Sequence, residues 1–132
     1  MAALTDTGEL LVLAWLLTTG TAVRPTAWYV ALHTADPTET GAVAEVTTGT
    51  DANYIRKSIT FATPASGQDL SNASVSWTVN SGSGGYTVTH VSIWTQATAG
   101  ICLLKGELLA YRALVANGVL TFNSGDIVAA AD

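Results

Sequence analysis

The hydrophobic positions near the start of the chain repeat at helical spacing. A helix is predicted to begin at Asp6, with Glu9 completing a capping box three residues later, and to end near Gly20. One apolar stripe consists of Leu10, Leu13, Ala14 and Leu17. The rest of the circumference is also apolar, through Leu11, Val12, Trp15 and Leu16. A helix that is apolar nearly all round must be buried on more than one side, either under the sheets of its own domain or against another subunit.

Beyond Pro25 the pattern changes to the two-residue alternation of β-strands. Strands are predicted over residues 28–33, 54–61, 74–79, 86–95, 101–110 (extendable to 114) and 127–129. In the first strand the alternation places Trp28, Val30 and Leu32 on one face, with Trp28 inward. In the second it places Ile55, Ile59 and Phe61 on one side and Tyr54 on the other. In the third, Val75, Trp77 and Val79 point inward. Asn117-Gly118 between apolar pairs predicts a tight hairpin, and residues 34–52 form a long exposed loop.

Short strands separated by frequent turns are typical of antiparallel all-β architectures. We therefore expect a mainly β fold, an antiparallel β-sandwich or barrel of about seven or eight short strands with one N-terminal α-helix. The chain is predicted to form a single domain over residues 1–132. Within it, residues 1–24 would be a helical anchor and residues 25–132 the β-sandwich.

Composition narrows the functional classes. Hydrophobic residues make up 48% of the 132 residues and charged residues only 11%, which excludes intrinsic disorder. The formal net charge of −5 argues against a nucleic-acid partner, because phosphates must be neutralised by cations. The apolar run Leu10–Leu17 is far shorter than the roughly 20 residues of a membrane helix, and the first twenty residues lack the basic start of a signal peptide. We expect a soluble chain without a membrane partner.

Few residues could carry catalysis or bind a ligand. A Cys102/His90 dyad is conceivable, but Cys102 lies in an apolar strand with no nucleophile elbow or helix start beside it, and His33 only ends a strand. The acidic residues of the 34–52 loop lack the spacing of a calcium loop. At most Trp94 and Trp15 are available to stack on a sugar, and a place in the core is the first expectation for each tryptophan. We expect no catalytic residue, no cofactor and no metal site.

A role in assembly agrees better with these features. Few charges, high hydrophobicity and a helix apolar on all sides indicate a surface that becomes buried on association. The alternative is a monomer with an unusually large core. The residues predicted to form the interface are Leu11, Val12, Trp15 and Leu16.

Several motifs occur in a fixed order along the chain. They are the short apolar helix followed by Gly-Thr, YVALHTADPTETG at 29–41, NYIR at 53–56, THVSIW at 89–94, the GxxLLxGxL-like segment at 100–108 and FxxGD at 122–126. In this the chain resembles a family of small virion proteins of tailed phages, described as tail-fibre or minor capsid proteins. The resemblance spans nearly the whole chain.

The resemblance implies a β-rich structural module of a virion without enzyme activity. A compact domain without a fibrous repeat suggests first a capsid decoration or minor capsid protein, a homotrimer that docks on the major capsid protein and stabilises the shell. The alternative is a tail-fibre, spike or baseplate component that contacts the host surface, through Trp94 and the long loop. Either would place the protein in the virion, on the capsid surface or in the tail.

Overall fold

The computed structural model describes residues 2–130 and contains one helix and nine strands within them. The helix α1 spans Asp6–Leu17. The strands are β1 (Ala2–Leu4), β2 (Trp28–His33), β3 (Lys57–Ile59), β4 (Gln68–Leu70), β5 (Val75–Thr78), β6 (Tyr86–Trp94), β7 (Cys102–Leu114), β8 (Val119–Phe122) and β9 (Val128–Ala130). The prediction of a mainly β fold with one N-terminal helix is confirmed.

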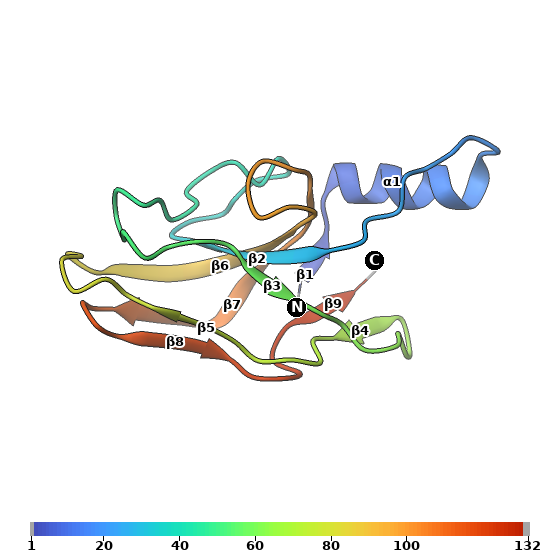
Figure 1. The fold of residues 1–132 in the computed structure, drawn as a ribbon. Helices are drawn as coiled ribbons and strands as arrows, with labels where there is room; N and C mark the ends of the chain where they lie inside the picture. The colour runs from blue at the N-terminus through green and yellow to red at the C-terminus, as the bar shows by residue number, and fades with distance from the viewer. Residues whose placement is uncertain (1, 131–132) are drawn as a thin grey trace.

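Seven strands form a curled sheet, and two form a small sheet that faces it. The order in the large sheet is β3-β2-β6-β7-β1-β9-β4, and β5 pairs with β8 in the small one (Figure 1). Neighbouring strands are antiparallel except β1 and β9, which run parallel. The expected antiparallel arrangement therefore has one exception, the pairing of the first and last strands of the described chain.

The core lies between the two sheets. From the large sheet, Val30, Leu32 and Ile93 are fully buried, and Trp77 of the small sheet is 2% exposed. The rings of Trp77 and Phe122 pack edge to face, with 6.1 Å between their centroids. The indole N–H of Trp77 donates to the Ile55 carbonyl at 2.8 Å. Trp77 thus satisfies its one polar group while it fills the space between the sheets, as a buried tryptophan must.

The turn predicted at Asn117-Gly118 is present, but the two strands that it joins do not pair with each other as a hairpin. The turn itself forms, with Asn117 at φ 62° and the Gly118 amide donating to the Val115 carbonyl at 2.8 Å. However, β8 leaves β7 there and pairs with β5, Trp77 opposite Leu120. The turn therefore carries the chain from the large sheet to the small one.

The predicted second strand is also only partly correct. Regular pairing is limited to Lys57–Ile59, and residues 51–56 form a turn in which the Tyr54 amide donates to the Asp51 carbonyl. In this irregular segment Tyr54 is buried and Ile55 is 58% exposed, so Ile55 does not share the buried face of Ile59 as predicted. Two-residue alternation assigns faces only where the backbone is a strand.

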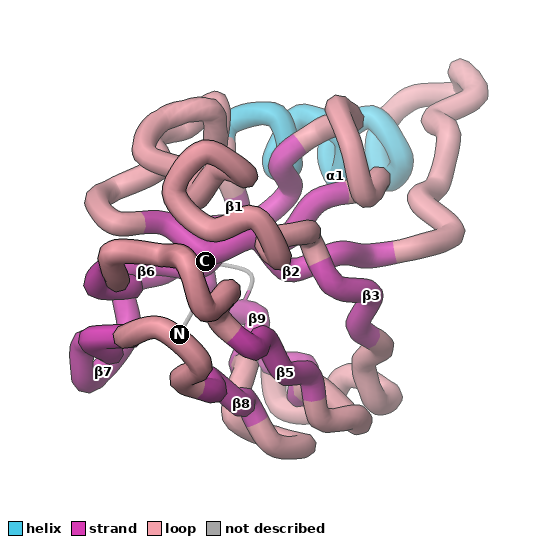
Figure 2. The backbone as a smooth tube through the Cα atoms, turned by 60° about the vertical axis from the view of Figure 1, so that its left-hand side comes forward, coloured by secondary structure: helices cyan, strands magenta, loops and turns pink. Residues whose placement is uncertain are grey.

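The N-terminal segment, predicted to be a helical anchor, also contributes a strand to the body. This strand, β1, lies inside the large sheet between β7 and β9. The helix cap is Thr5 rather than Asp6, and the helix ends at Thr18 in extended backbone rather than near Gly20. The helix then projects past the ends of the strands, and residues 18–27 turn back along it to β2 (Figure 1). Figure 2 shows the helix beside β1 and β2, on the side of the molecule away from β5 and β8.

Candidate docking surface

The first turn of α1 is fixed directly on β7. The hydroxyl of Thr5, which is fully buried, donates to the Cys102 carbonyl at 2.7 Å and accepts from the Gly8 amide at 3.1 Å. Gly8 approaches so closely that a Cβ there would lie 2.3 Å from the Leu103 carbonyl oxygen. Only glycine permits this contact, and it sets the position from which the rest of the helix extends.

The long loop also holds the start of the helix. The carboxylate of Glu39 accepts from the Asp6 amide at 3.1 Å, where a helix N-terminus favours negative charge. Lys105 of β7 lies 3.0 Å from Glu39 and 3.2 Å from Asp36. Its hydrogen bond lowers the pKa of the Glu39 carboxyl. Loop, helix and β7 are thereby joined at the base of the helix.

Beyond the first turn the helix is apolar and exposed. Among its residues only Gly8 is buried. The exposed fractions of the large apolar residues on the helix and in the following segment are Leu10 66%, Val12 39%, Leu13 50%, Trp15 63%, Leu16 61%, Leu17 77% and Val23 82%. Contiguous apolar surface of this extent marks an interaction site on a folded protein. Within the single chain, the predicted burial on several sides does not occur.

The four residues predicted as interface lie on this helix, within one half of its circumference. Leu11 is half-buried and lines a pocket together with Val12 and Trp15, whereas Leu16 is exposed outside the pocket. Their place in an interface stays a prediction, because the structure contains a single chain.

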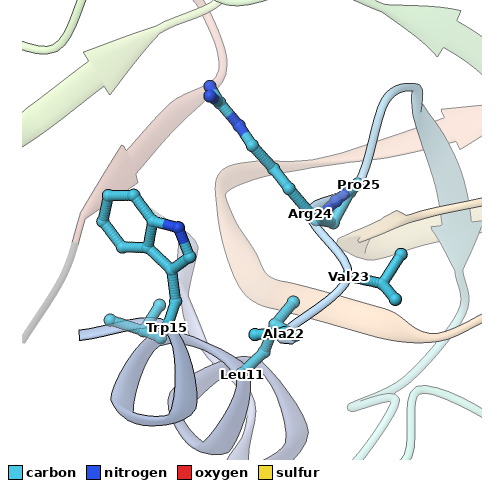
Figure 3. A pocket seen from close by; sticks show the side chains of 7 residues that line it. Leu11, Trp15, Ala22, Val23, Arg24 and Pro25 are labelled. Atoms are coloured by element: carbon cyan, nitrogen blue, oxygen red, sulfur yellow. The ribbon is translucent and has the colours of Figure 1, made fainter. Parts of the chain in front are cut away.

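The pocket between α1 and the returning segment has a volume of about 260 Å³. Its other walls are Ala22, Val23, Arg24 and Pro25, and Figure 3 shows Trp15 and Arg24 extending toward the same side of it. These four residues were missed from the sequence. The basic Arg24 beside Pro25, between apolar residues, is the signal that could have drawn attention to them.

A second polar cluster lies at the ends of β2 and β6 and includes several of the motif residues. The guanidinium of Arg56 forms a bidentate ion pair with Glu45, at 2.8 Å from Nε to Oε1 and 2.7 Å from Nη2 to Oε2. Nη1 donates to the carbonyls of Ala99 at 2.7 Å and Gln96 at 3.3 Å. Tyr54 donates to Glu45 at 3.0 Å. Burial raises the pKa of Glu45, but the hydrogen bonds and charge of Arg56 outweigh it, and the net direction is downward.

Arg56 also covers Trp94, for which the sequence favours a place in the core over contact with a sugar. Its guanidinium carbon lies 3.6 Å from the centroid of the Trp94 ring, and Trp94 is only 6% exposed. The Trp94 indole donates to Ser92 at 2.7 Å, and Ser92 contacts His33 Nε2 at 2.7 Å. Trp94 cannot stack on a sugar, so the prediction that this ring contacts the host surface is wrong.

The structure does not assemble the Cys102/His90 dyad. Cys102 pairs opposite Trp94, four residues along β6 from His90, a separation of roughly 13 Å along a strand. Cys102 is 3% exposed, and burial raises the pKa of its thiol to about 11. His90 contacts Thr89 Oγ1 at 2.8 Å. A buried thiol that stays protonated is a poor nucleophile.

The acidic residues of the loop have separate partners. Asp36 and Glu39 pair with Lys105, Glu45 pairs with Arg56, and Asp51 accepts from the amides of Asn53 and Asn80 and from the hydroxyl of Tyr86. Over residues 2–130, no three His, Cys, Asp or Glu side chains are grouped as metal ligands would be. Nor does the described chain include a helix long and apolar enough to cross a membrane.

The molecule is a mainly β protein whose compact body carries an exposed apolar helix. The chain matches the family described as podophage GP4 fiber I protein gp80 over residues 3–130, and it belongs to this family. It is therefore a structural protein of a phage virion. The description supports the tail-fibre alternative better than the capsid decoration expected first. No curated protein matches the chain significantly.

Proposed function

We propose that the protein is a non-enzymatic subunit of the phage tail-fibre apparatus and that α1 attaches it to a neighbouring protein of the virion. The observation that carries this proposal is the exposure of the apolar helix on a chain of the fibre family. The β-body serves as a rigid mount. Thr5, Gly8 and Lys105 hold the base of the helix on that mount, so force applied to the helix passes to β7.

The hydrophobic effect supplies the attachment energy. Each large apolar side chain that passes from water into an interface contributes roughly 1.5–3 kcal/mol when fully buried. Trp15 is the largest apolar side chain on the surface of the helix and is 63% exposed. Aromatic anchors of this kind carry a disproportionate share of interface energy.

The experiment is to produce phage particles with Trp15→Asp and measure incorporation. We expect the variant to fold but to be lost from purified particles. Ile55→Asp is the matched control, because Ile55 is 58% exposed on the β-body, and it should be incorporated normally. Wild-type incorporation of Trp15→Asp would overturn the attachment role of the helix.

Copy number per particle tests the location in the virion. A handful to a few tens of copies, measured by quantitative mass spectrometry against the major capsid protein, is expected for the tail. Hundreds of copies near a simple fraction of the capsid subunits would instead support capsid decoration and contradict the tail assignment.

A further inference from the structure

The helix has two apolar faces of different shape. The outer face is a stripe of Leu10, Leu13 and Leu17 that begins at the acidic Asp6, and the 4-3-4 spacing of these residues places them along one line of the helix. The inner face contributes Leu11, Val12 and Trp15 to the pocket, which the returning segment completes. At 100° per residue these faces point about 180° apart, so the stripe cannot fill the pocket of its own chain.

The stripe and the pocket are complementary in size. A cavity of about 150 Å³ lined by apolar residues is enough to hold benzene. The pocket of about 260 Å³ therefore has room for one or two leucine side chains. Leu10, Leu13 and Leu17 are 66%, 50% and 77% exposed, which makes them available to enter such a cavity.

The two faces are also complementary in charge. Asp6 stands at the start of the stripe and Arg24 at the pocket, and both are exposed. Among the described residues, the ion pairs are those of Arg56 and Lys105, and neither Asp6 nor Arg24 takes part in one. A stripe seated in a pocket would bring an acidic and a basic end to the same contact, which favours one orientation over others.

The area is sufficient for a weak, specific contact. The exposed large apolar residues of the two faces together present roughly 700 Å², which with a polar rim is the size of a weak, transient interface, below about 1,200 Å². A contact of this size is expected to associate at micromolar concentrations, which the crowding of copies on a particle would supply.

We propose that the occupant of the pocket is the stripe of a second copy of this chain, so that copies associate head to tail through α1. This inference rests on the proposed function, because it names the partner of the same helix. Each copy then uses its stripe on one neighbour and its pocket on the other. Such heterologous contacts produce closed rings or open arrays according to the rotation between copies.

The angle between the faces favours an open array. Three parallel helices around a threefold axis contact their neighbours through faces about 60° apart, whereas the stripe and pocket lie about 180° apart. The homotrimer expected from the sequence does not follow from this geometry.

Sedimentation velocity of the purified chain, from a few to several hundred micromolar, is the test. The wild type is expected to grow beyond a dimer as concentration rises. Leu13→Glu destroys the stripe and Val23→Glu destroys the pocket wall, and each variant alone should remain monomeric. An equimolar mixture of the two should form a dimer and nothing larger, because one intact stripe and one intact pocket remain. Circular dichroism identical to wild type shows that each variant is folded.

Each contrary outcome has a distinct meaning. If Val23→Glu still dimerises, the contact is stripe on stripe, and the head-to-tail proposal is wrong. If the wild type is monomeric throughout, a second copy is not the occupant. In that case, loss of Trp15→Asp from particles would still support the proposed function, with a different virion protein on the helix.

A charge exchange tests the orientation. Arg24→Glu should weaken self-association roughly two- to fivefold, the value of one exposed ion pair. Adding Asp6→Lys to the same chain should restore it. Failure of the double variant to recover association would overturn the predicted juxtaposition of these two residues.

Discussion

The guanidinium of Arg56 lies over the indole of Trp94, with 3.6 Å between the guanidinium carbon and the ring centroid. The same guanidinium pairs with Glu45 and donates to the carbonyls of Gln96 and Ala99. One side chain thus connects the long loop, the end of β6 and the turn before β7. This explains why an arginine follows Tyr54 by two residues in the motif at 53–56.

Arg56→Ala is expected to lower the free energy of unfolding by about 2–3 kcal/mol. The loss is large because the Arg56 side chain is only 9% exposed and its removal leaves the Glu45 carboxylate half-buried without its partner. Arg56→Lys should recover little of it, because an ammonium can neither pair bidentately nor stack on the ring. Urea unfolding measures both variants.

Lys57→Ala is the control for Arg56. It removes the neighbouring cation, which has no ion pair among the described residues, and should change stability by no more than about 0.5 kcal/mol. Equal effects of the two alanine variants would show that net charge, and not the contacts of Arg56, determines the result.

The free energy of unfolding is expected to fall as the pH drops below about 6.5, because His33 becomes protonated more readily in the unfolded chain than in the fold. Its Nδ1 contacts the Val43 carbonyl at 2.9 Å, so Nδ1 carries the hydrogen and Nε2 accepts from Ser92. Burial lowers the pKa of His33 from 6.5, and the hydrogen bond to Val43 only partly opposes it. Glu45 favours the charged form, and Arg56 and His90 oppose it. Because the unfolded chain takes up this proton at a higher pH than the folded chain, the contribution of neutral His33 to the free energy of unfolding is fully present above about pH 6.5 and decreases below it.

The measurement is the free energy of unfolding between pH 7.5 and 5. His33→Gln should be less stable than the wild type at pH 7.5 but should lose less stability on acidification. A His33→Gln variant that keeps the full slope would contradict the assignment. Glu45 and Asp51, whose carboxyl pKa values are lowered in the fold, add their own loss only below about 4.5.

Cys102, the single cysteine of the chain, is expected to resist alkylation in the native state. With its pKa raised to about 11 by burial, only about one thiol in a thousand is ionised at pH 8, and the side chain is 3% exposed. Iodoacetamide at pH 8 should modify it only after urea unfolding. The control is Cys102→Ser with Ser81→Cys, which moves the thiol to an exposed loop and should react without urea. Rapid native modification of Cys102 would show that its strand opens readily.

The parts of the fold that were predicted are those with strong local patterns. The alternation over 28–33 and around Trp77 reproduced β2 and β5. In β5 alternate side chains are buried, whereas in β2 both faces are covered from Val30 to His33, so only the strand itself and not its burial followed from the pattern. The three residues of β1 were missed, since so short a segment has no period and is fixed by its pairing with β7 and β9. The pairing of β8 with β5 was missed for a similar reason, because it joins strands far apart in the sequence.

The candidate site was predicted in the same partial way. An apolar circumference on the helix can be read from the sequence, and it identified Trp15 and its neighbours. The pocket could not be predicted, because it depends on residues 22–25 folding back along the helix without any regular secondary structure. The roles of Arg56 and Trp94 likewise depend on contacts between distant segments.

Gly8→Ala is expected to destabilise the protein by about 1–3 kcal/mol, although alanine is the better helix former. The added Cβ would lie 2.3 Å from the Leu103 carbonyl oxygen and 3.2 Å from Leu4 Cδ2, so the first turn must move away from β7. Thermal unfolding measures the loss. Gly20→Ala is the matched control, because a Cβ there would meet only Thr18 Oγ1 at 3.7 Å, and it should change little. If Gly8→Ala proved neutral or stabilising, the helix would not be fixed on β7, and the rigid mounting of the docking surface would be wrong.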